Sequence, residues 1–323
     1  MKTSRRNAAA IAVALISICA PAWAQTYPSK PIRLVLPTAP GTAPDTIARI
    51  VGDKLSRALG QPVIVENKPG AGGIIAMNQL KSAPADGYTL ALVHAAVATV
   101  TPLTYKEAQY DIERDYATVA LIGVTPMIFV ANPKFEAKTL ADAVKLAKAA
   151  PDTVAAGSPN RTSIPHLANE LLAMKSGIRL QQVPFTTTGQ GVQAVVAGDI
   201  AMYTDGVAPL IQLIKSGRLR ALAVASDKVL PGLEGIPLAK GTVPDLKVMG
   251  WFMVAAPKGT PAAVVERLNQ ELNTALQLAD VNAKFQEFGT YTTPGTVAEA
   301  QRFVKQEKAL FGGVVKAIGV KPE

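Results

Sequence analysis

The sequence predicts an α/β fold with two parallel-sheet lobes and a hinge between them. Strand-like and helix-like segments alternate along most of the 323 residues, which is the rhythm of βαβ units. Two breaks, at Thr125-Pro126 and in the Gly/Pro-rich run 226–247, enclose a middle segment. We therefore expect one domain at 25–126 and 248–323 and a second at 127–247. Such a chain crosses between the lobes twice, which makes a hinge.

The first 24 residues are typical of an export signal that is removed from the mature chain. Three basic residues within the first six precede an apolar run at 8–20, and Ala22-Trp23-Ala24 is a cleavage sequence of the small-x-small kind. The only cysteine, Cys19, lies inside this signal, so we expect a mature chain without thiols or disulfides. These features predict a soluble protein of the bacterial periplasm.

Short apolar runs that are bounded by turn residues predict the strands. They lie at 32–36, 63–66, 89–93, 119–124, 127–131, 153–156, 179–183, 200–203, 219–225 and 250–256. Amphipathic repeats and capping residues predict helices between them, at 45–59, 74–81, 140–149, 164–175, 192–197 and 208–215. Two further helices, which open at Thr260-Pro261 and at the capping box 296–299, complete the chain.

The loop after the first strand has the composition of an anion site. It consists of small and turn-forming residues, namely Thr38, Ala39, Pro40, Gly41, Thr42 and Ala43. Thr42 and Asp45 have the spacing of a capping box at the start of the next helix. Unpaired N–H groups and the helix dipole would favour negative charge there. An ordinary βα connection has a similar composition, and this segment alone favours that simpler interpretation.

Two loops of the middle segment resemble the first one in kind. The loop at 157–163 precedes a helix that carries His166, and the loop at 184–190 follows the next strand. Both are rich in hydroxyls and backbone donors, which can bind a carboxylate without a full ion pair. The candidate ligand-binding residues in these two loops are Ser158, Asn160, Thr162, Ser163, Thr187, Thr188 and Gly189.

Composition and spacing exclude several other classes of function. The formal charge of +9 comes from scattered basic residues, and only 5% of the residues are aromatic, so we expect no nucleic-acid binding. The two histidines are far apart and the mature chain lacks cysteine, so the spacing predicts no metal site. The glycine-rich stretch 70–73 lacks the third glycine and the paired acid of a dinucleotide site, and predicts a tight turn instead.

Taken in order, eight short motifs make the mature chain resemble the Bug family, the periplasmic substrate-binding receptors of tripartite tricarboxylate transporters. They are YPSKPI at 27–32, PG at 40–41 with Asp45, VENKPGAGG at 65–73, DGYTL at 86–90, PHL at 165–167, AGDI at 197–200, SGRLRALAV at 216–224 and APKGTP at 256–261. Each motif is weak alone, whereas their order and spacing are specific. The resemblance covers essentially the whole mature chain.

The resemblance implies a type II periplasmic binding protein, a Venus flytrap of two Rossmann-like lobes. In that family, backbone groups and bridging waters from the first loop, and from the loops that match 158–163 and 184–189, hold one carboxylate of the ligand. It thus implies a monomeric receptor, not an enzyme, that needs no cofactor. It would bind an aliphatic or aromatic mono- or dicarboxylate and deliver it to membrane subunits similar to TctA and TctB.

The chain departs from the family pattern in all three loops. Family members usually have glycine where Thr42 and Thr162 stand, and a basic residue followed by glycine where Thr186-Thr187 stand. The threonine hydroxyls either donate to the ligand or narrow the cleft. The missing basic residue disfavours a highly charged tricarboxylate as ligand.

Four residues have competing interpretations. Asp45 is better explained as a capping carboxylate than as a ligand contact, since an acid repels anions. His166 at a helix start is better explained as a structural hydrogen-bonding residue, whereas His94 after a strand end fits either role equally. Asp205 follows the strand at 200–203 and is either a ligand contact, which accepts from an amine or hydroxyl, or a turn residue.

An exported small-molecule hydrolase is the alternative function. Ser158 or Ser163, His166 and Asp205 would form its notional triad. The chain has no G-x-S-x-G elbow, however, and Ser163 and His166 would share one helix start instead of approaching each other as nucleophile and base. The sequence therefore favours the receptor.

Overall fold

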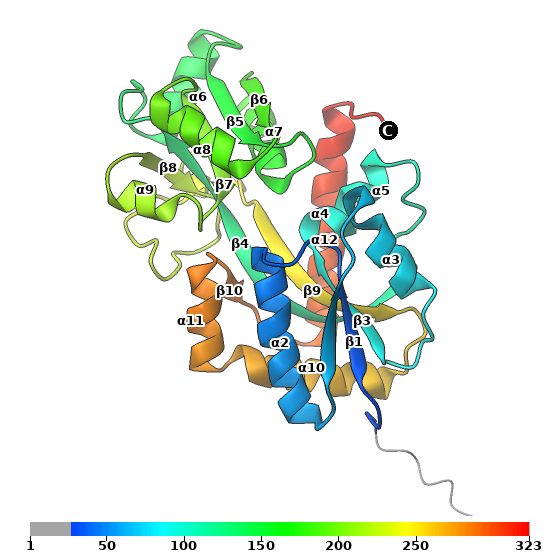
Figure 1. The fold of residues 1–323 in the computed structure, drawn as a ribbon. Coiled ribbons are helices and arrows are strands. Elements are labelled where there is room, and N and C mark those ends of the chain that lie inside the picture. Colours follow the sequence, from blue (N-terminus) through cyan, green and yellow to red (C-terminus); the bar gives the residue numbers. More distant parts are fainter. Residues whose placement is uncertain (1–26, 323) are drawn as a thin grey trace, which may run out of the picture.

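One long strand belongs to both lobes of the protein. The computed structural model describes residues 27–322, so the predicted export signal and Cys19 lie outside the described residues. Strand β4 (Tyr116–Ala131) pairs with β9 (Met249–Pro257) as far as the partners Pro126 and Met249. From Met127 onward β4 pairs with strands of the second lobe. The two lobes are therefore joined by continuous β-structure (Figure 1).

The first lobe has a mixed sheet. Strand β1 (Ile32–Leu36) lies between β2 (Val63–Asn67) and β3 (Thr89–His94) and is parallel to both. Strand β9 is antiparallel to β3 and to β4, and the short β10 (Tyr291–Thr292) is antiparallel to β4. The sheet therefore contains antiparallel strands beside the parallel ones that the βαβ rhythm predicts. The sequence does not indicate them, because an apolar run looks the same whichever way the strand points.

The second lobe also mixes parallel and antiparallel strands. Strand β5 (Ala155–Pro159) is parallel to β6 (Gln181–Phe185) and to β7 (Met202–Gly206). Strand β4 is antiparallel to β7 and to β8 (Arg220–Val224). All the strands named so far had been predicted, within a few residues, except the two-residue β10.

The strands expected separately at 119–124 and 127–131 are one continuous strand, since β4 runs through Thr125-Pro126. A proline in a strand removes one ladder N–H and is tolerated where no partner needs that group. Pro126 lies at the position where β9 stops pairing with β4 and where β7 begins to pair at Met127. The strand therefore changes partners at the proline without being interrupted.

The helices cover both sheets. The structure contains, in chain order, α2 (Ala43–Leu59), η1 (Ala71–Gly73), α3 (Ile74–Lys81), α4 (Ala95–Thr99), α5 (Thr101–Thr104), α6 (Leu140–Ala149), α7 (Ile164–Ser176), α8 (Thr188–Ala197), α9 (Ile211–Lys215), η2 (Ala239–Gly241), α10 (Ala262–Leu276), α11 (Ala279–Glu287) and α12 (Val297–Ala317). The sequence did not predict α4, α5 and α11. These helices are short and lack a long amphipathic repeat, which is the signal that predicts a helix.

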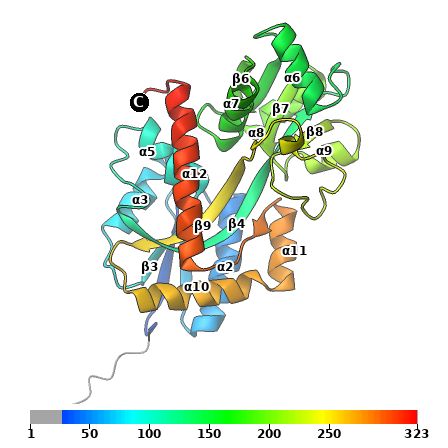
Figure 2. The ribbon, with the colours of Figure 1, turned by 180° about the vertical axis from the view of Figure 1, so that it is seen from behind.

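The predicted repeat of α2 is confirmed by its burial. Ile47, Val51 and Leu55 are at most 1% exposed and pack with residues of α10 such as Leu268. The C-terminal helix α12 packs against β4 and α4 of the first lobe and also against α7 of the second. Figure 2 shows α12 running upright along the back of the molecule toward α7. Within residues 27–322 no helix combines the length and apolar character that a membrane crossing requires.

Candidate functional site

A cavity of about 690 Å³ lies between the two lobes. The first lobe contributes Pro37 and Pro44, the glycines of the turn at 70–73 and residues between His94 and Tyr105. The second lobe contributes residues of the loop at 160–165 together with Asp205 and Gly206. The strands that join the lobes contribute Thr125, Met127, Gly250, Trp251 and Phe252. The site thus lies where the strand ends of both lobes meet, as expected for α/β binding proteins.

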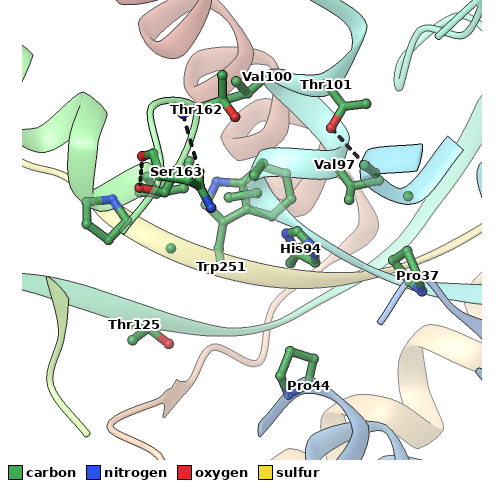
Figure 3. Close-up of a pocket in the computed structure, with 18 of the residues that line it drawn as sticks. Pro37, Pro44, His94, Val97, Val100, Thr101, Thr125, Thr162, Ser163 and Trp251 are labelled. Atoms are coloured by element: carbon green, nitrogen blue, oxygen red, sulfur yellow. Dashed lines mark hydrogen bonds between the residues drawn. The ribbon is translucent and has the colours of Figure 1, made fainter. Parts of the chain in front are cut away.

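The floor of the cavity is held rigidly by Trp251. Its indole Nε1 donates to Oε2 of Glu307 on α12 at 3.2 Å, and its ring meets Phe303 edge-on with centroids 5.8 Å apart. Trp251 is only 1% exposed, so its ring is a fixed part of the wall. Figure 3 shows Trp251 between His94 and the loop that carries Thr162 and Ser163.

His94 is the N-cap of α4 and lies at the end of β3, where the chain turns along the cavity. Burial lowers the pKa of His94 to about 4, so the ring is neutral at neutral pH. Among the described residues, no side chain or backbone group forms a hydrogen bond with this ring. A neutral imidazole has one donor and one acceptor nitrogen, and either is available to a solute.

The glycine turn before α3 forms part of the same wall. Gly70, Gly72 and Gly73 all have positive φ and all line the cavity. A Cβ at Gly73 would lie 2.6 Å from Cγ2 of Val97, which is closer than any real contact. The predicted tight turn is confirmed, and the missing side chains allow α4 to approach it.

The loop at 160–165 forms the wall of the second lobe. Asn160 accepts from the Thr162 N–H at 3.3 Å through Oδ1, and its own N–H donates to the Phe185 carbonyl at 2.8 Å. Ser163 caps α7: its Oγ accepts from the His166 N–H at 3.2 Å and donates to the Pro159 carbonyl. The loop is therefore fixed by its own polar groups before any solute binds.

Asp205 is the one acidic residue among the described lining residues. Its carboxylate accepts from Thr188 Oγ1 at 2.9 Å, from Tyr203 Oη at 3.1 Å and from the Gly206 N–H at 2.8 Å. Burial raises the pKa of Asp205 above its usual value, against the effect of these donors. All three of these contacts of Asp205 are with residues of its own lobe.

Comparison with known proteins explains this arrangement. The sequence model of the tripartite tricarboxylate transporter family receptor, TctC, matches residues 47–320. The chain belongs to the TctC receptor family. It is 32% identical over 313 residues to Protein BugT of Bordetella pertussis, an alignment that covers 96% of each chain.

Two solved structures similar to this TctC receptor contain carboxylates. The adipate complex of R. palustris Rpa4515 is 28% identical, with a TM-score of 0.76, and covers 92% of this chain and 100% of that one. MatC from Rhodopseudomonas palustris with bound malate is 27% identical, with a TM-score of 0.71, and covers 90% and 100%. The predicted Bug-family membership and the two-lobed binding-protein fold are confirmed. Proteins of this family are periplasmic receptors, not enzymes.

Five of the predicted ligand-binding residues of this TctC receptor line the cavity: His94, Asn160, Thr162, Ser163 and Asp205. The other ten do not line it in this conformation: Thr38, Ala39, Pro40, Gly41, Thr42, Ala43, Ser158, Thr187, Thr188 and Gly189. Ser158 is fully buried, and its Oγ lies 3.3 Å from Nδ1 of His166. Thr187 caps α8 in a capping box with Gln190.

The predicted capping box of Thr42 and Asp45 is wrong. Thr42 is the N-cap of α2, but its hydroxyl donates to the Ala39 carbonyl at 2.8 Å. The Asp45 carboxylate accepts from the N–H of Gly41 at 2.9 Å and also from Arg49 and Asn67. The acid therefore ties the first loop to α2 and β2.

The triad of the hydrolase alternative is not assembled in this TctC receptor. Asp205 contacts Thr188 and Tyr203, whereas His166 lies near Ser158 and Glu170. Ser163 is occupied as a helix cap. Ser158 and His166 do contact each other, but Ser158 is fully buried and neither residue lines the cavity. Asp205 belongs to a separate hydrogen-bond network, so the three groups do not form a nucleophile with its base and orienting acid at the cavity.

The sequence did not indicate several lining residues, above all Trp251, Phe252, Met127, Tyr105 and Thr101. The first three lie on the strands that cross between the lobes, and strand periodicity does not show which side faces a cleft. Tyr105 and Thr101 belong to the segment of α4 and α5, which had not been predicted. The alanine-rich stretch 95–98 directly after a strand is the signal that would have indicated a helix there.

Proposed function

We propose that this TctC receptor captures a small organic carboxylate between its lobes and delivers it to a tripartite transporter. The observation that carries the proposal is the composition of the cavity wall, which combines hydroxyls, an amide, a neutral imidazole and backbone groups from both lobes. Such groups donate to a carboxylate without a full ion pair. The solutes of two structural neighbours, adipate and malate, are carboxylates as well.

Closure of the lobes would bring the remaining predicted loops to the solute. Pro37 and Pro44 both line the cavity and bracket the loop at 38–43. Thr188 of the third loop contacts Asp205, which is itself a lining residue. A solute that touches both lobes only when they are closed shifts the population toward the closed state.

The remaining assignments of the sequence are part of the same proposal. Residues 1–24 direct export and are removed, and the mature protein works as a monomer in the periplasm. The domain at 25–126 and 248–323 and the domain at 127–247 are the two moving bodies. The closed, loaded receptor docks on membrane subunits similar to TctA and TctB, without a cofactor and without nucleic acid.

A thermal-shift screen of the purified mature protein tests this function. The library pairs each carboxylate with its carboxamide, which has the same shape without the charge. A ligand at a hundredfold excess over its Kd stabilises the native state by about 2.7 kcal/mol and raises the melting temperature measurably. We expect carboxylates to raise it and their amides not to. A screen in which no carboxylate acts, or in which amides act equally, contradicts the proposal.

A further inference from the structure

The charge of the cavity wall restricts which carboxylate fits. Among the 24 described residues that line the cavity, none is a lysine or arginine. One lining residue is acidic, Asp205, and it faces the cavity from the second lobe. His94 is held neutral by burial and supplies no positive charge at neutral pH. The wall therefore contains no cation that would neutralise a carboxylate.

Two arginines lie near the cavity without lining it. Arg49 forms an ion pair with Asp45 at 3.0 Å and also donates to Asn67. Arg161 belongs to the lining loop, but it is exposed and is not one of the lining residues. Neither guanidinium is therefore part of the cavity wall.

One carboxylate is nevertheless accommodated without a cation. The loop at 160–165 and the segment after β3 supply backbone and side-chain donors, as does the ring of His94. A second carboxylate in the same cavity would have to give up its hydration near Asp205, with no positive group to replace the lost water. Burial of an unpaired charge is strongly unfavourable.

Most of the remaining wall is apolar, although Thr101 and Thr125 also line it. Val97, Val100, Tyr105, Met127, Trp251 and Phe252 surround the space between the polar loops. The Trp251 ring is fixed by Glu307 and Phe303, so this surface is formed before a solute arrives. A pre-formed apolar wall favours a solute with an uncharged body, because such a body displaces water from the wall when it binds.

We infer that the preferred solute is a monocarboxylate with an uncharged, apolar or aromatic body, and that dicarboxylates are disfavoured. The inference rests on the proposed function, because it specifies the solute class of that same cavity. It differs from the solutes of the adipate and malate complexes, which carry two carboxylates each.

Calorimetric titration with two matched pairs of ligands tests the inference. Hexanoate and adipate share a six-carbon chain and differ by one carboxylate, and benzoate and terephthalate share a benzene ring and differ in the same way. We expect hexanoate or benzoate to bind at least 30-fold more tightly than its dicarboxylate. Equal or tighter binding of adipate or terephthalate overturns the inference but leaves a carboxylate receptor. Absence of binding by all four also overturns it, and the wider screen then decides separately on the receptor.

Variants that add or remove a cation test the physical cause of the preference. Thr162→Lys adds a cation at the rim and keeps the backbone N–H that donates to Asn160, so adipate should bind about tenfold more tightly. Thr274→Lys, on the exposed face of α10, adds the same charge away from the cavity and should change neither affinity more than twofold. Unchanged adipate affinity in Thr162→Lys would show that a missing cation does not explain the preference. Loss of adipate binding in Arg161→Gln would show the same, because Arg161 would then already supply that cation.

Discussion

The indole N–H of Trp251 on β9 donates to the carboxyl group of Glu307 on α12 across 3.2 Å. Trp251 forms the floor of the cavity, and α12 packs against both lobes. The contact therefore connects the cavity to a helix that contacts both lobes. Glu307 is 7% exposed, and burial raises its pKa to about 7 from the ordinary 4.5.

The first prediction concerns the pH dependence of stability through Glu307. The unfolded carboxyl ionises near pH 4.5 while the folded one stays protonated to about pH 7. As the pH rises from about 4.5 to about 7, the free energy of unfolding should therefore fall by about 3 kcal/mol. Above about pH 7 this group should cause no further change. Glu307→Gln, which cannot ionise, should lack this loss in denaturant titrations, whereas the exposed Glu266→Gln should retain it. Identical slopes in the two variants would exclude Glu307 as the source.

The second prediction concerns the two histidines of the chain, His94 and His166. Burial lowers the pKa of both to about 4, with Arg161 adding to the effect on His166. Their ring protons should show no NMR titration between about pH 5.5 and 8. Because the unfolded rings titrate near 6.5, the stability that both contribute above that pH should be lost as the pH falls toward 4. A titration midpoint near 6.5 for either ring contradicts the burial described here.

The third prediction concerns the carboxylate that anchors the first loop. Asp45 is 4% exposed; burial opposes its ionisation, but hydrogen bonds from Arg49, the Gly41 N–H and Asn67 outweigh this and lower its pKa. Asp45→Ala leaves those donors without a partner and should cost about 2 to 4 kcal/mol in chemical denaturation. Asp53 on the same helix forms an exposed pair with Arg57, so Asp53→Ala should cost no more than about 0.5 kcal/mol. An equal loss of unfolding free energy in the two variants would show that the hydrogen bonds of Asp45 stabilise the protein no more than an exposed ion pair does.

The fourth prediction concerns the glycine turn. Gly73→Ala combines a strained φ of 95° with a clash against Val97, and should destabilise the protein by about 2 kcal/mol or more while pushing Val97 into the cavity. Gly60→Ala, at the C-cap of α2, has a positive φ but no neighbour within 4 Å and should cost about 1 kcal/mol. Solute affinity should fall only in Gly73→Ala, as measured by calorimetry. A fall of the same size in Gly60→Ala would point to a global effect.

Local chemistry explains which parts of the fold the sequence could predict. The four-residue repeat of Ile47, Val51 and Leu55 specifies both α2 and its buried face, and Ser163 marks the start of α7 as its cap. The predicted capping box at Thr42 does not form, because the Asp45 carboxylate accepts hydrogen bonds from Arg49 and Asn67, which lie outside the motif. Such competition between partners is set by the packing of α2 on β2, which the motif does not contain.

The position of the cavity depends on how the lobes are joined. Trp251 pairs with Val124, the neighbour of Thr125, on the crossing strands, although the two segments are far apart in the sequence. The strand direction that brings them together is a property of the whole sheet, so local patterns could not reveal it. Of the loops that local patterns did identify, only some residues reach the cavity, such as Thr162, whereas Thr42 does not. Which loop residues face the cavity depends on contacts between segments that are distant in the sequence.

The central claim is that a carboxylate binds in the cavity between the lobes. Its most direct test is the calorimetric Kd of the best carboxylate from the screen, measured for the unmodified protein and for Thr162→Trp. Thr162 lines the cavity, so the larger indole should occupy part of the space. Thr274→Trp on α10 is the control. Filling the cavity should weaken binding at least a hundredfold, a loss of about 2.7 kcal/mol, with the control unchanged. An affinity for Thr162→Trp within twofold of the unmodified protein would show that the solute binds elsewhere.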